Sequence, residues 1–132
     1  MQTTKIIWVN GCFDILHRGH VEMLRYAKSL GNYLIVGIDA DWRVAKSKGP
    51  TRPFNCQEDR KILLESIRYV DKVIIFETDS ELRGLINHIK PDCMVVGSDW
   101  KGKTVIGSEY SKSVSFFDRI GEYSTTKILE KK

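Results

Sequence analysis

Two histidines, His17 and His20, lie three positions apart in the stretch NGCFDILHRGH, which spans residues 10–20 and contains two glycines. Imidazole N–H groups can donate hydrogen bonds to phosphate oxygens and stabilise the charge that develops there as a leaving group departs. Gly11 and Gly19 allow tight backbone turns and the close approach of a ligand. This combination favours a phosphate site over a metal site, because two histidines at this spacing need a further ligand placed opposite them.

The position of the stretch between a predicted strand and a predicted helix supports the same chemistry. Residues 5–10 (KIIWVN) form an apolar run typical of a buried strand, and residues 19–30 carry a helical stripe of apolar side chains that ends before Gly31. Ligands of open parallel sheets bind beyond the carboxyl ends of the strands. The first turn of a helix also presents unpaired N–H groups and a positive dipole end to an anion. We therefore expect both histidines to face a bound phosphate group.

Apolar β-rich runs alternate with helical patterns along the rest of the chain. Strands are predicted at residues 5–10, 33–38, 72–76, 93–96 and 114–117. Several of them are apolar throughout, as strands buried on both faces of a parallel sheet are. Alternation of this kind predicts right-handed crossovers and an open parallel α/β sheet of about five strands, with helices on both faces.

Local signals predict where the helices begin. Asn55 followed by Glu58 resembles a capping box, Ser80 is predicted to open a helix that ends before Pro91, and Ser124 is predicted to open a last short helix. Two segments lack either periodicity and are predicted as long loops, which in a compact domain are usually functional or mobile: residues 42–55 and 98–107.

Composition limits the classes of protein to consider. With 132 residues, 42% of them hydrophobic and 29% charged, the chain has the size and content of one globular domain, 1–132. Three widely spaced cysteines argue against a disulfide scaffold or a zinc site. The net charge of +4 is dispersed among acidic residues, so we expect no nucleic-acid partner. No apolar run is long enough to cross a bilayer, and we expect a cytoplasmic protein without a membrane partner.

The stretch GCFDILHRGH resembles the HxGH signature of the nucleotidyltransferase superfamily, which includes the cytidylyltransferases, and the resemblance extends over essentially the whole chain. It implies a Rossmann-like fold and an enzyme in which a substrate phosphate attacks the α-phosphorus of a nucleoside triphosphate, so that pyrophosphate leaves. It also implies Mg²⁺ as cofactor and a homodimer.

Two further stretches resemble phosphate-binding parts of this superfamily. KSKGPTRPFNCQEDR, residues 46–60, is similar to the basic loop that binds the triphosphate and the incoming phosphate. Its lysines and arginines could donate to a transition state whose negative charge is spread over several oxygens. YSTTK, residues 123–127, resembles the second phosphate signature, in which hydroxyls at a helix start hold the β- and γ-phosphates.

The resemblance implies three groups of site residues. The candidate catalytic residues are His17, His20, Lys46 and Thr125. The candidate nucleotide-binding residues are Gly11, Cys12, Phe13, Asp14, His17, Gly19, His20, Arg60, Gly97, Asp99, Ser124, Thr125 and Thr126. The candidate acceptor-binding residues are Asp39, Asp41, Lys48, Arg52, Arg68 and Arg119.

The carboxylates among these candidates have alternative roles. Asp14 either binds Mg²⁺, orients His17 or caps its own turn. Asp39 and Asp41 follow the second predicted strand, where they either contact the acceptor or cap the next turn.

Two subfamilies compete for the substrate. NGCFDILHRGHV, KGPTRPFN, IKPD and VIGSE resemble the heptose 1-phosphate adenylyltransferases, whereas RKILLESIRYVDKV, GSDWKGK and Arg119 resemble the glycerol-3-phosphate cytidylyltransferases. The first set is longer and includes the opening motif, so ATP and a sugar phosphate are favoured over CTP and a polyol phosphate. A non-catalytic member that binds a nucleotide or RNA is the alternative of another class, and the intact His17, His20 and Lys46 argue against it.

Overall fold

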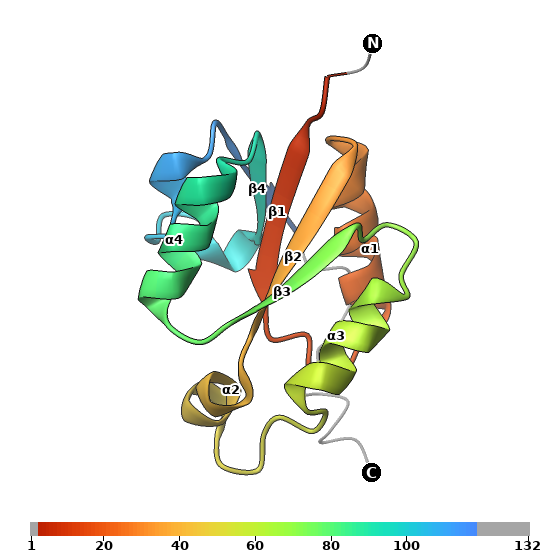
Figure 1. Cartoon of the computed structure of the whole chain (residues 1–132), viewed down its shortest axis with the longest axis vertical. Helices are drawn as coiled ribbons and strands as arrows, with labels where there is room; N and C mark the ends of the chain where they lie inside the picture. The colour runs from red at the N-terminus through yellow and green to blue at the C-terminus, as the bar shows by residue number, and fades with distance from the viewer. Residues whose placement is uncertain (1–2, 119–132) are drawn as a thin grey trace.

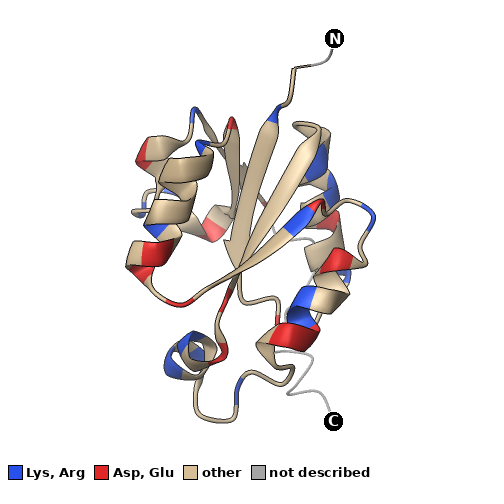
Figure 2. Cartoon of the chain, viewed as in Figure 1, with Lys and Arg blue, Asp and Glu red and all other residues tan. Residues whose placement is uncertain are grey.

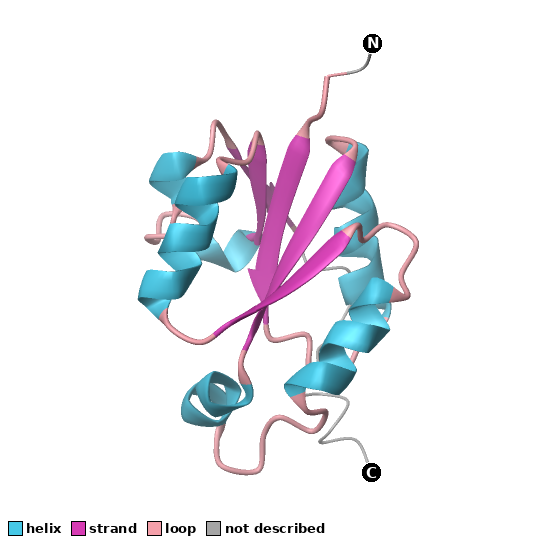
Figure 3. Cartoon of the chain, viewed as in Figure 1, coloured by secondary structure: helices cyan, strands magenta, loops and turns pink. Residues whose placement is uncertain are grey.

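The computed structural model describes residues 3–118, which contain one five-stranded, all-parallel sheet. Its strands, ordered β3-β2-β1-β4-β5, are β1 (Ile6–Gly11), β2 (Tyr33–Asp39), β3 (Lys72–Phe76), β4 (Cys93–Gly97) and β5 (Val114–Phe117). Each strand lies within one residue of its predicted bounds. The predicted Rossmann-like α/β fold class with an open parallel sheet is therefore confirmed (Figures 1 and 3).

Helices cover both faces of this sheet. α1 (Arg18–Ser29) and α3 (Gln57–Glu65) lie on one face, α4 (Asp79–Ile89) lies on the other, and α2 (Asp41–Lys48) lies beyond the carboxyl ends of the strands (Figure 1). Two short 3₁₀ turns, Ser98–Trp100 and Ser108–Tyr110, lie between β4 and β5. Within residues 3–118, no helix has the length and apolar content required to span a membrane.

Alternate side chains of each strand supply the two halves of the core, because successive residues of a strand point to opposite faces. In β1, Ile7 and Val9 pack toward α1 and α3, and Trp8 between them packs toward α4. All three are at most 1% exposed. Burial of each large apolar side chain contributes roughly 1.5–3 kcal/mol to the stability of the fold. This packed core fixes the strands from which the loops at the carboxyl edge extend.

The structure corrects three of the predicted helix boundaries. The segment 42–55, predicted as a loop, contains α2, which the sequence pattern conceals because only Val44 of this helix is buried. α3 begins after Cys56 rather than Asn55, since Asn55 uses its backbone and side chain to bind Asp14. α4 is capped by Thr78, whose hydroxyl accepts from the Glu81 N–H, and not by Ser80.

Gly31 is required by close packing rather than by a helix-ending conformation. α1 ends at the C-cap residue Leu30, and a Cβ on Gly31 would lie 2.5 Å from the carbonyl oxygen of Lys5. The turn from α1 into β2 can approach the start of β1 only because this position has no side chain.

Candidate active site

His17 and His20 cap the start of α1 reciprocally. His17 is the N-cap residue, and its Nδ1 accepts a hydrogen bond of 3.1 Å from the Gly19 N–H. The His20 Nδ1 accepts one of 3.3 Å from the His17 N–H. The two rings stack with centroids 3.8 Å apart and planes 24° from parallel. Since each Nδ1 is an acceptor, either ring in its neutral form carries its proton on Nε2.

His20 is a neutral ring throughout the physiological pH range. Burial, with a smaller contribution from the neighbouring His17, lowers the pKa of His20 from 6.5 to about 3. The ring therefore acts as a hydrogen-bond donor through Nε2 and not as a cation. A neutral donor can stabilise the negative charge that develops on a phosphate oxygen in the transition state. It binds the ground state of the substrate less strongly than a cation would.

This depressed pKa predicts an acid sensitivity of the fold. The unfolded chain binds a proton at His20 near pH 6.5 and the folded protein only near pH 3, so the free energy of unfolding should fall as pH is lowered through this interval. Urea unfolding at steps from about pH 6.5 to about pH 4 measures the slope. The His20→Gln variant, which keeps an acceptor for the cap, should show a flatter curve over that range. Equal slopes in the two proteins would contradict the assignment. Asp14 and Asp92, whose pKa values are lowered, also reduce the free energy of unfolding near the acid end, but they do so equally in both proteins.

The sheet opens at the carboxyl end of β1, the strand that leads into the histidine turn. β1 and β4 are paired at Ile7–Cys93 and Trp8–Met94 only, although each strand continues for three more residues toward its carboxyl end. The chain crosses from one side of the sheet to the other between these two strands, which is where doubly wound folds bind their ligands. Gly97, at the end of β4, lies at this opening.

Gly97 and Asp99, both predicted to bind the nucleotide, lie together beyond β4. A Cβ on Gly97 would be 2.7 Å from Asp99 Oδ1, so the glycine makes room for that carboxylate.

Gly11 and Phe13 are similarly paired, because a Cβ on Gly11 would lie 3.2 Å from the Phe13 ring. Phe13 has a left-handed φ of 49° and is 4% exposed, with its ring centroid 5.1 Å from that of His20. Its side chain therefore supports the His20 ring from the core.

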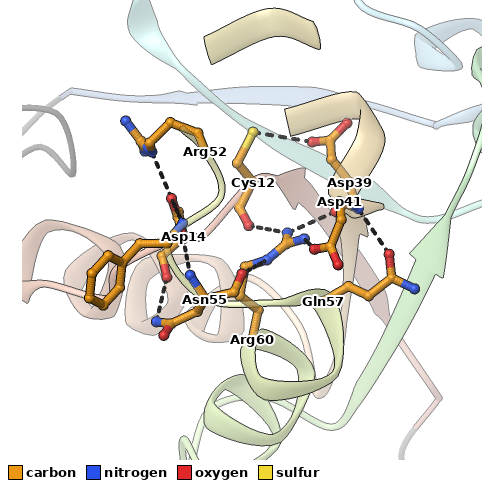
Figure 4. A network of polar contacts seen from close by, with 9 residues as sticks. Cys12, Asp14, Asp39, Asp41, Arg52, Asn55, Gln57 and Arg60 are labelled. Atoms are coloured by element: carbon orange, nitrogen blue, oxygen red, sulfur yellow. Dashed lines mark hydrogen bonds and ion pairs between the residues drawn. The ribbon is translucent and has the colours of Figure 1, made fainter. Parts of the chain in front are cut away.

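Arg60 has a different role from the one predicted. It is 1% exposed, and its guanidinium donates to the carbonyls of Cys12, Asp39 and Asn55 at 2.8, 2.7 and 3.0 Å (Figure 4). A fourth contact of 2.8 Å joins it to Asp41 Oδ1. Arg60 is thus not available to the triphosphate, because α3 directs it inward, where it ties the loop after β1 to the loop after β2.

Asp14 anchors the segment 52–55. Its carboxylate accepts from the backbone N–H groups of Phe54 and Asn55 and from Arg52 Nε, each at 2.8 Å (Figure 4). Burial opposes ionisation, but these donors outweigh it and hold the pKa of Asp14 below its usual value of 3.8. Both carboxylate oxygens of Asp14, 2% exposed, are thereby occupied, and the guanidinium of Arg52 lies beside them, so Asp14 does not fit the predicted role of Mg²⁺ ligand.

Cys12 and Asp39 connect the ends of β1 and β2. Burial and the Asp39 carboxylate raise the pKa of the Cys12 thiol from 9.0 to about 11. The neutral thiol donates to Asp39 Oδ2 at 3.6 Å, and Asp39 Oδ1 accepts from Arg43 Nε at 2.9 Å. Cys12 is therefore a structural donor and not a nucleophile. Asp39 and Asp41, predicted acceptor contacts, each hold an arginine: Asp39 binds Arg43 and Asp41 binds Arg60.

The remaining basic candidates are divided between the two ends of the sheet. Lys46 and Lys48 are exposed on the last turn of α2, at the carboxyl edge, and the positive charge of Lys48 acts on the Cys12 thiol. Figure 2 shows basic residues on α2 and in the connection from α2 to α3. Arg68 lies in the turn before β3, at the opposite edge, and is not brought together with the histidines. Four candidates lie outside the described residues: Arg119, Ser124, Thr125 and Thr126.

The sequence analysis missed three residues of the site: Asn55, Arg43 and Asp79. Asn55 binds Asp14 through both backbone and side chain, and Arg43 joins Asp39 to Asp79 with hydrogen bonds of 2.9 and 2.8 Å. The Asp39–Arg43 pair has an i,i+4 spacing, which would have indicated the contact had α2 been predicted as a helix.

Comparison with known proteins places this architecture in a family. A family profile described as cytidylyltransferase-like matches residues 8–131. The chain is 48% identical over 127 residues to the bifunctional protein HldE of Sulfurimonas denitrificans and 50% identical to that of Nitratiruptor sp., in each case over 96% of this chain. It corresponds to 26% and 27% of those relatives, so it spans about a quarter of their length.

Solved structures share the fold at lower identity. A lipopolysaccharide core biosynthesis protein from Thermoplasma volcanium superposes with a TM-score of 0.69 at 23% identity, over 92% of this chain and 100% of that one. A bifunctional NMN adenylyltransferase/ADP ribose pyrophosphatase from Francisella tularensis gives 0.68 at 20% identity, over 98% of this chain and 41% of that one. The extent of the profile match and the identity to the HldE proteins agree with the resemblance seen in the sequence: the chain belongs to the cytidylyltransferase-like family of nucleotidyltransferases.

Proposed function

We propose that this protein transfers a nucleoside monophosphate from a nucleoside triphosphate, with ATP favoured, to a sugar phosphate such as heptose 1-phosphate. An oxygen of the acceptor phosphate attacks the α-phosphorus, the bond from the α-phosphorus to the bridging oxygen breaks, and pyrophosphate leaves with that oxygen. The observation that carries the proposal is the stacked, reciprocally capped pair of His17 and His20 in the turn after β1, the strand at which the sheet opens toward β4.

The residues of the chain provide the electrostatic part of this reaction. The triphosphate would lie with its phosphates at the start of α1, where the helix dipole and Nε2 of the neutral His20 favour negative charge. Lys46 and Lys48 would donate to phosphate oxygens from the last turn of α2. Thr125 and its neighbours, outside the described residues, keep their predicted role on the β- and γ-phosphates.

Mg²⁺ belongs to the proposal as a cofactor, although Asp14 does not fit as its ligand. Among residues 3–118, no group of three or more His, Cys, Asp or Glu side chains could hold a metal ion. Magnesium is commonly bound through phosphates and water with few protein carboxylates, and it would supply charge neutralisation on the triphosphate.

The acceptor is the finer part of the proposal. The name shared by the curated relatives, bifunctional protein HldE, and the longer heptose-type stretches support heptose 1-phosphate and ATP over glycerol 3-phosphate and CTP. Homodimerisation and a cytoplasmic location stay predictions.

A pyrophosphate-release screen tests the proposal. The intact chain is incubated with Mg²⁺ and each of the four common ribonucleoside triphosphates, against heptose 1-phosphate and glycerol 3-phosphate in parallel. We expect the fastest release with ATP and heptose 1-phosphate. Release only with CTP and glycerol 3-phosphate would instead assign the cytidylyltransferase activity.

The same screen separates catalysis from simple binding. If no combination releases pyrophosphate while calorimetry detects a bound triphosphate, the chain is a nucleotide-binding member without transferase activity. Binding to single-stranded RNA at physiological salt, with no response to triphosphates, would support the RNA-binding alternative.

A further inference from the structure

A surface hollow of about 380 Å³ lies between α2 and the start of α4. It is at the carboxyl edge of the sheet, beyond β2 and β3, where α2 lies below the first turn of α4 in Figure 1. Its lining residues come from three elements that are separate in the sequence: Asp39, Trp42, Arg43, Lys46, Ser47 and Asp79. Most of these residues take no part in the network around Arg60 and Asp14.

One wall of the hollow is a fixed polar array built on Arg43. The guanidinium binds Asp39 Oδ1 through Nε at 2.9 Å and Asp79 Oδ1 through a terminal nitrogen at 2.8 Å. Its Cζ also lies 5.1 Å from the centre of the Phe76 ring. Burial opposes the charge of Arg43, but the two carboxylates outweigh it and raise its pKa above the usual value. Arg43 is therefore neutralised by its own partners, and what this wall offers a ligand is carboxylate oxygen.

Carboxylates held in this way are acceptors for hydroxyl groups. The side chain of Asp79 is 63% exposed, and no described residue donates a hydrogen bond to its second oxygen, Oδ2. Asp79 and Glu81 occupy the first turn of α4, so their negative charge makes that helix start unfavourable for an anion. A neutral polyhydroxyl group fits this end of the hollow, and a phosphate does not.

One of the lining residues is an exposed aromatic side chain. Trp42 is 49% exposed although it is one of the largest apolar side chains of the protein, and the Arg43 Cζ lies 5.9 Å from its ring centre. Binding sites for small molecules commonly combine such an aromatic surface with a few placed polar groups. The C–H face of a sugar ring is apolar and can lie on an indole, while its hydroxyls point sideways to the carboxylates.

The hollow also has a basic lining residue, Lys46. Lys46 follows Trp42 by four residues on α2, so it lies on the same face about one turn, roughly 6 Å, further along the helix. No described carboxylate lies within ion-pair distance of Lys46. Asp39, in the wall, accepts the hydrogen bond from Cys12, which belongs to the loop that carries the histidines. A ligand with hydroxyls at one end and a phosphate at the other would thus direct its phosphate toward Lys46 and that loop.

We infer that this hollow is the acceptor subsite, and that its occupant is the ring of a sugar phosphate lying on Trp42 with hydroxyls on Asp79. The inference rests on the proposed transfer reaction and specifies the part of it that selects the acceptor. A three-carbon polyol phosphate has no ring to cover Trp42, so the hollow discriminates a sugar phosphate from glycerol 3-phosphate.

Steady-state kinetics of the Trp42→Ala variant test whether the sugar ring lies on Trp42. The KM for heptose 1-phosphate should rise about tenfold, as expected for the loss of roughly 50–60 Å² of apolar contact, while the KM for ATP stays unchanged. Trp42→Phe should recover much of the loss, and any KM for glycerol 3-phosphate should not respond. Asp79→Asn should also raise the KM for the sugar phosphate alone. Matched controls on the exposed face of α3, Ile62→Ala and Glu65→Gln, should change neither KM.

Direct binding separates this inference from the proposed reaction. Calorimetry with heptose 1-phosphate, with and without a non-hydrolysable ATP analogue, measures the subsite without turnover. If the protein transfers nothing but binds the sugar phosphate, and Trp42→Ala weakens that binding, the subsite stands and the reaction fails. If turnover occurs and Trp42→Ala leaves the KM for the sugar phosphate unchanged, the subsite is overturned and the reaction stands. Absence of both binding and turnover in the wild-type protein overturns both.

Discussion

Replacing either histidine of the capping pair should lower kcat by about a hundredfold or more, as removal of one transition-state donor typically does. The informative variants are His17→Asn and His20→Gln. An Asn at the N-cap can still accept from the Gly19 N–H, and a Gln three residues later can still accept from the N-cap N–H, so α1 keeps its start. Both variants lose the imidazole ring with its Nε2–H and keep only a terminal amide, so the loss in rate reports the ring rather than the cap.

Initial rates of pyrophosphate release, with ATP and heptose 1-phosphate saturating, measure this effect. Circular dichroism and urea unfolding confirm that the variants fold. His88→Ala is the matched control, because His88 is an exposed histidine in the last turn of α4 and should leave kcat unchanged. Full activity in a folded His20→Gln protein would remove His20 from the chemistry.

Loss of the Arg60 guanidinium should produce the largest change in stability. In Arg60→Met, the carbonyls of Cys12, Asp39 and Asn55 lose their donor in a place that water hardly reaches. Each buried, unsatisfied acceptor costs about 1–3 kcal/mol, so we expect the free energy of unfolding to fall by about 3 kcal/mol or more. The ion pair with Asp41 adds little to this sum, since the Asp41 side chain is 42% exposed and can be solvated.

Urea unfolding of Arg60→Met and of Arg68→Met measures the difference under identical conditions. Arg68 follows the same helix but is exposed, and its substitution should change the free energy of unfolding by less than about 0.5 kcal/mol. Arg60→Lys should lie between the two, because an ammonium group keeps the charge but cannot reach all four acceptors at once. Equal stability of Arg60→Met and Arg68→Met would show that the network of Figure 4 carries no stabilisation.

The elements of the fold follow from local patterns that the sequence displays directly. The five strands were predicted within one residue because each is a short apolar run bounded by polar residues, which is what burial on both faces of a parallel sheet requires. α2 was not predicted, because it lacks the apolar periodicity of a buried element. With only Val44 buried, its stability depends on contacts such as Arg43 with Asp39 and Asp79, and those partners are distant or belong to other elements.

The histidine pair could also be located from sequence, because its two members belong to one turn. Spacing and flanking glycines placed His17 and His20 at a strand-to-helix junction, and the structure puts them there. The reciprocal cap was not foreseen, since histidine is an uncommon N-cap residue and its Nδ1 must be aimed by the chain around it.

The roles of the charged residues were decided by the tertiary structure alone. Lys46 and Arg60 belong to one basic segment and were both predicted to donate hydrogen bonds to phosphate. In the structure, Lys46 is exposed on α2 and Arg60 is buried beneath the loops. The sequence alone does not indicate whether a charged side chain will be exposed to solvent, bind a ligand or pair with another side chain. That outcome depends on which distant segments pack around it, as the end of β1, the end of β2 and the start of α3 do around Arg60. The sequence by itself thus determined the sheet, the family and the histidine turn, and only packing decided which cations remain to meet a phosphate.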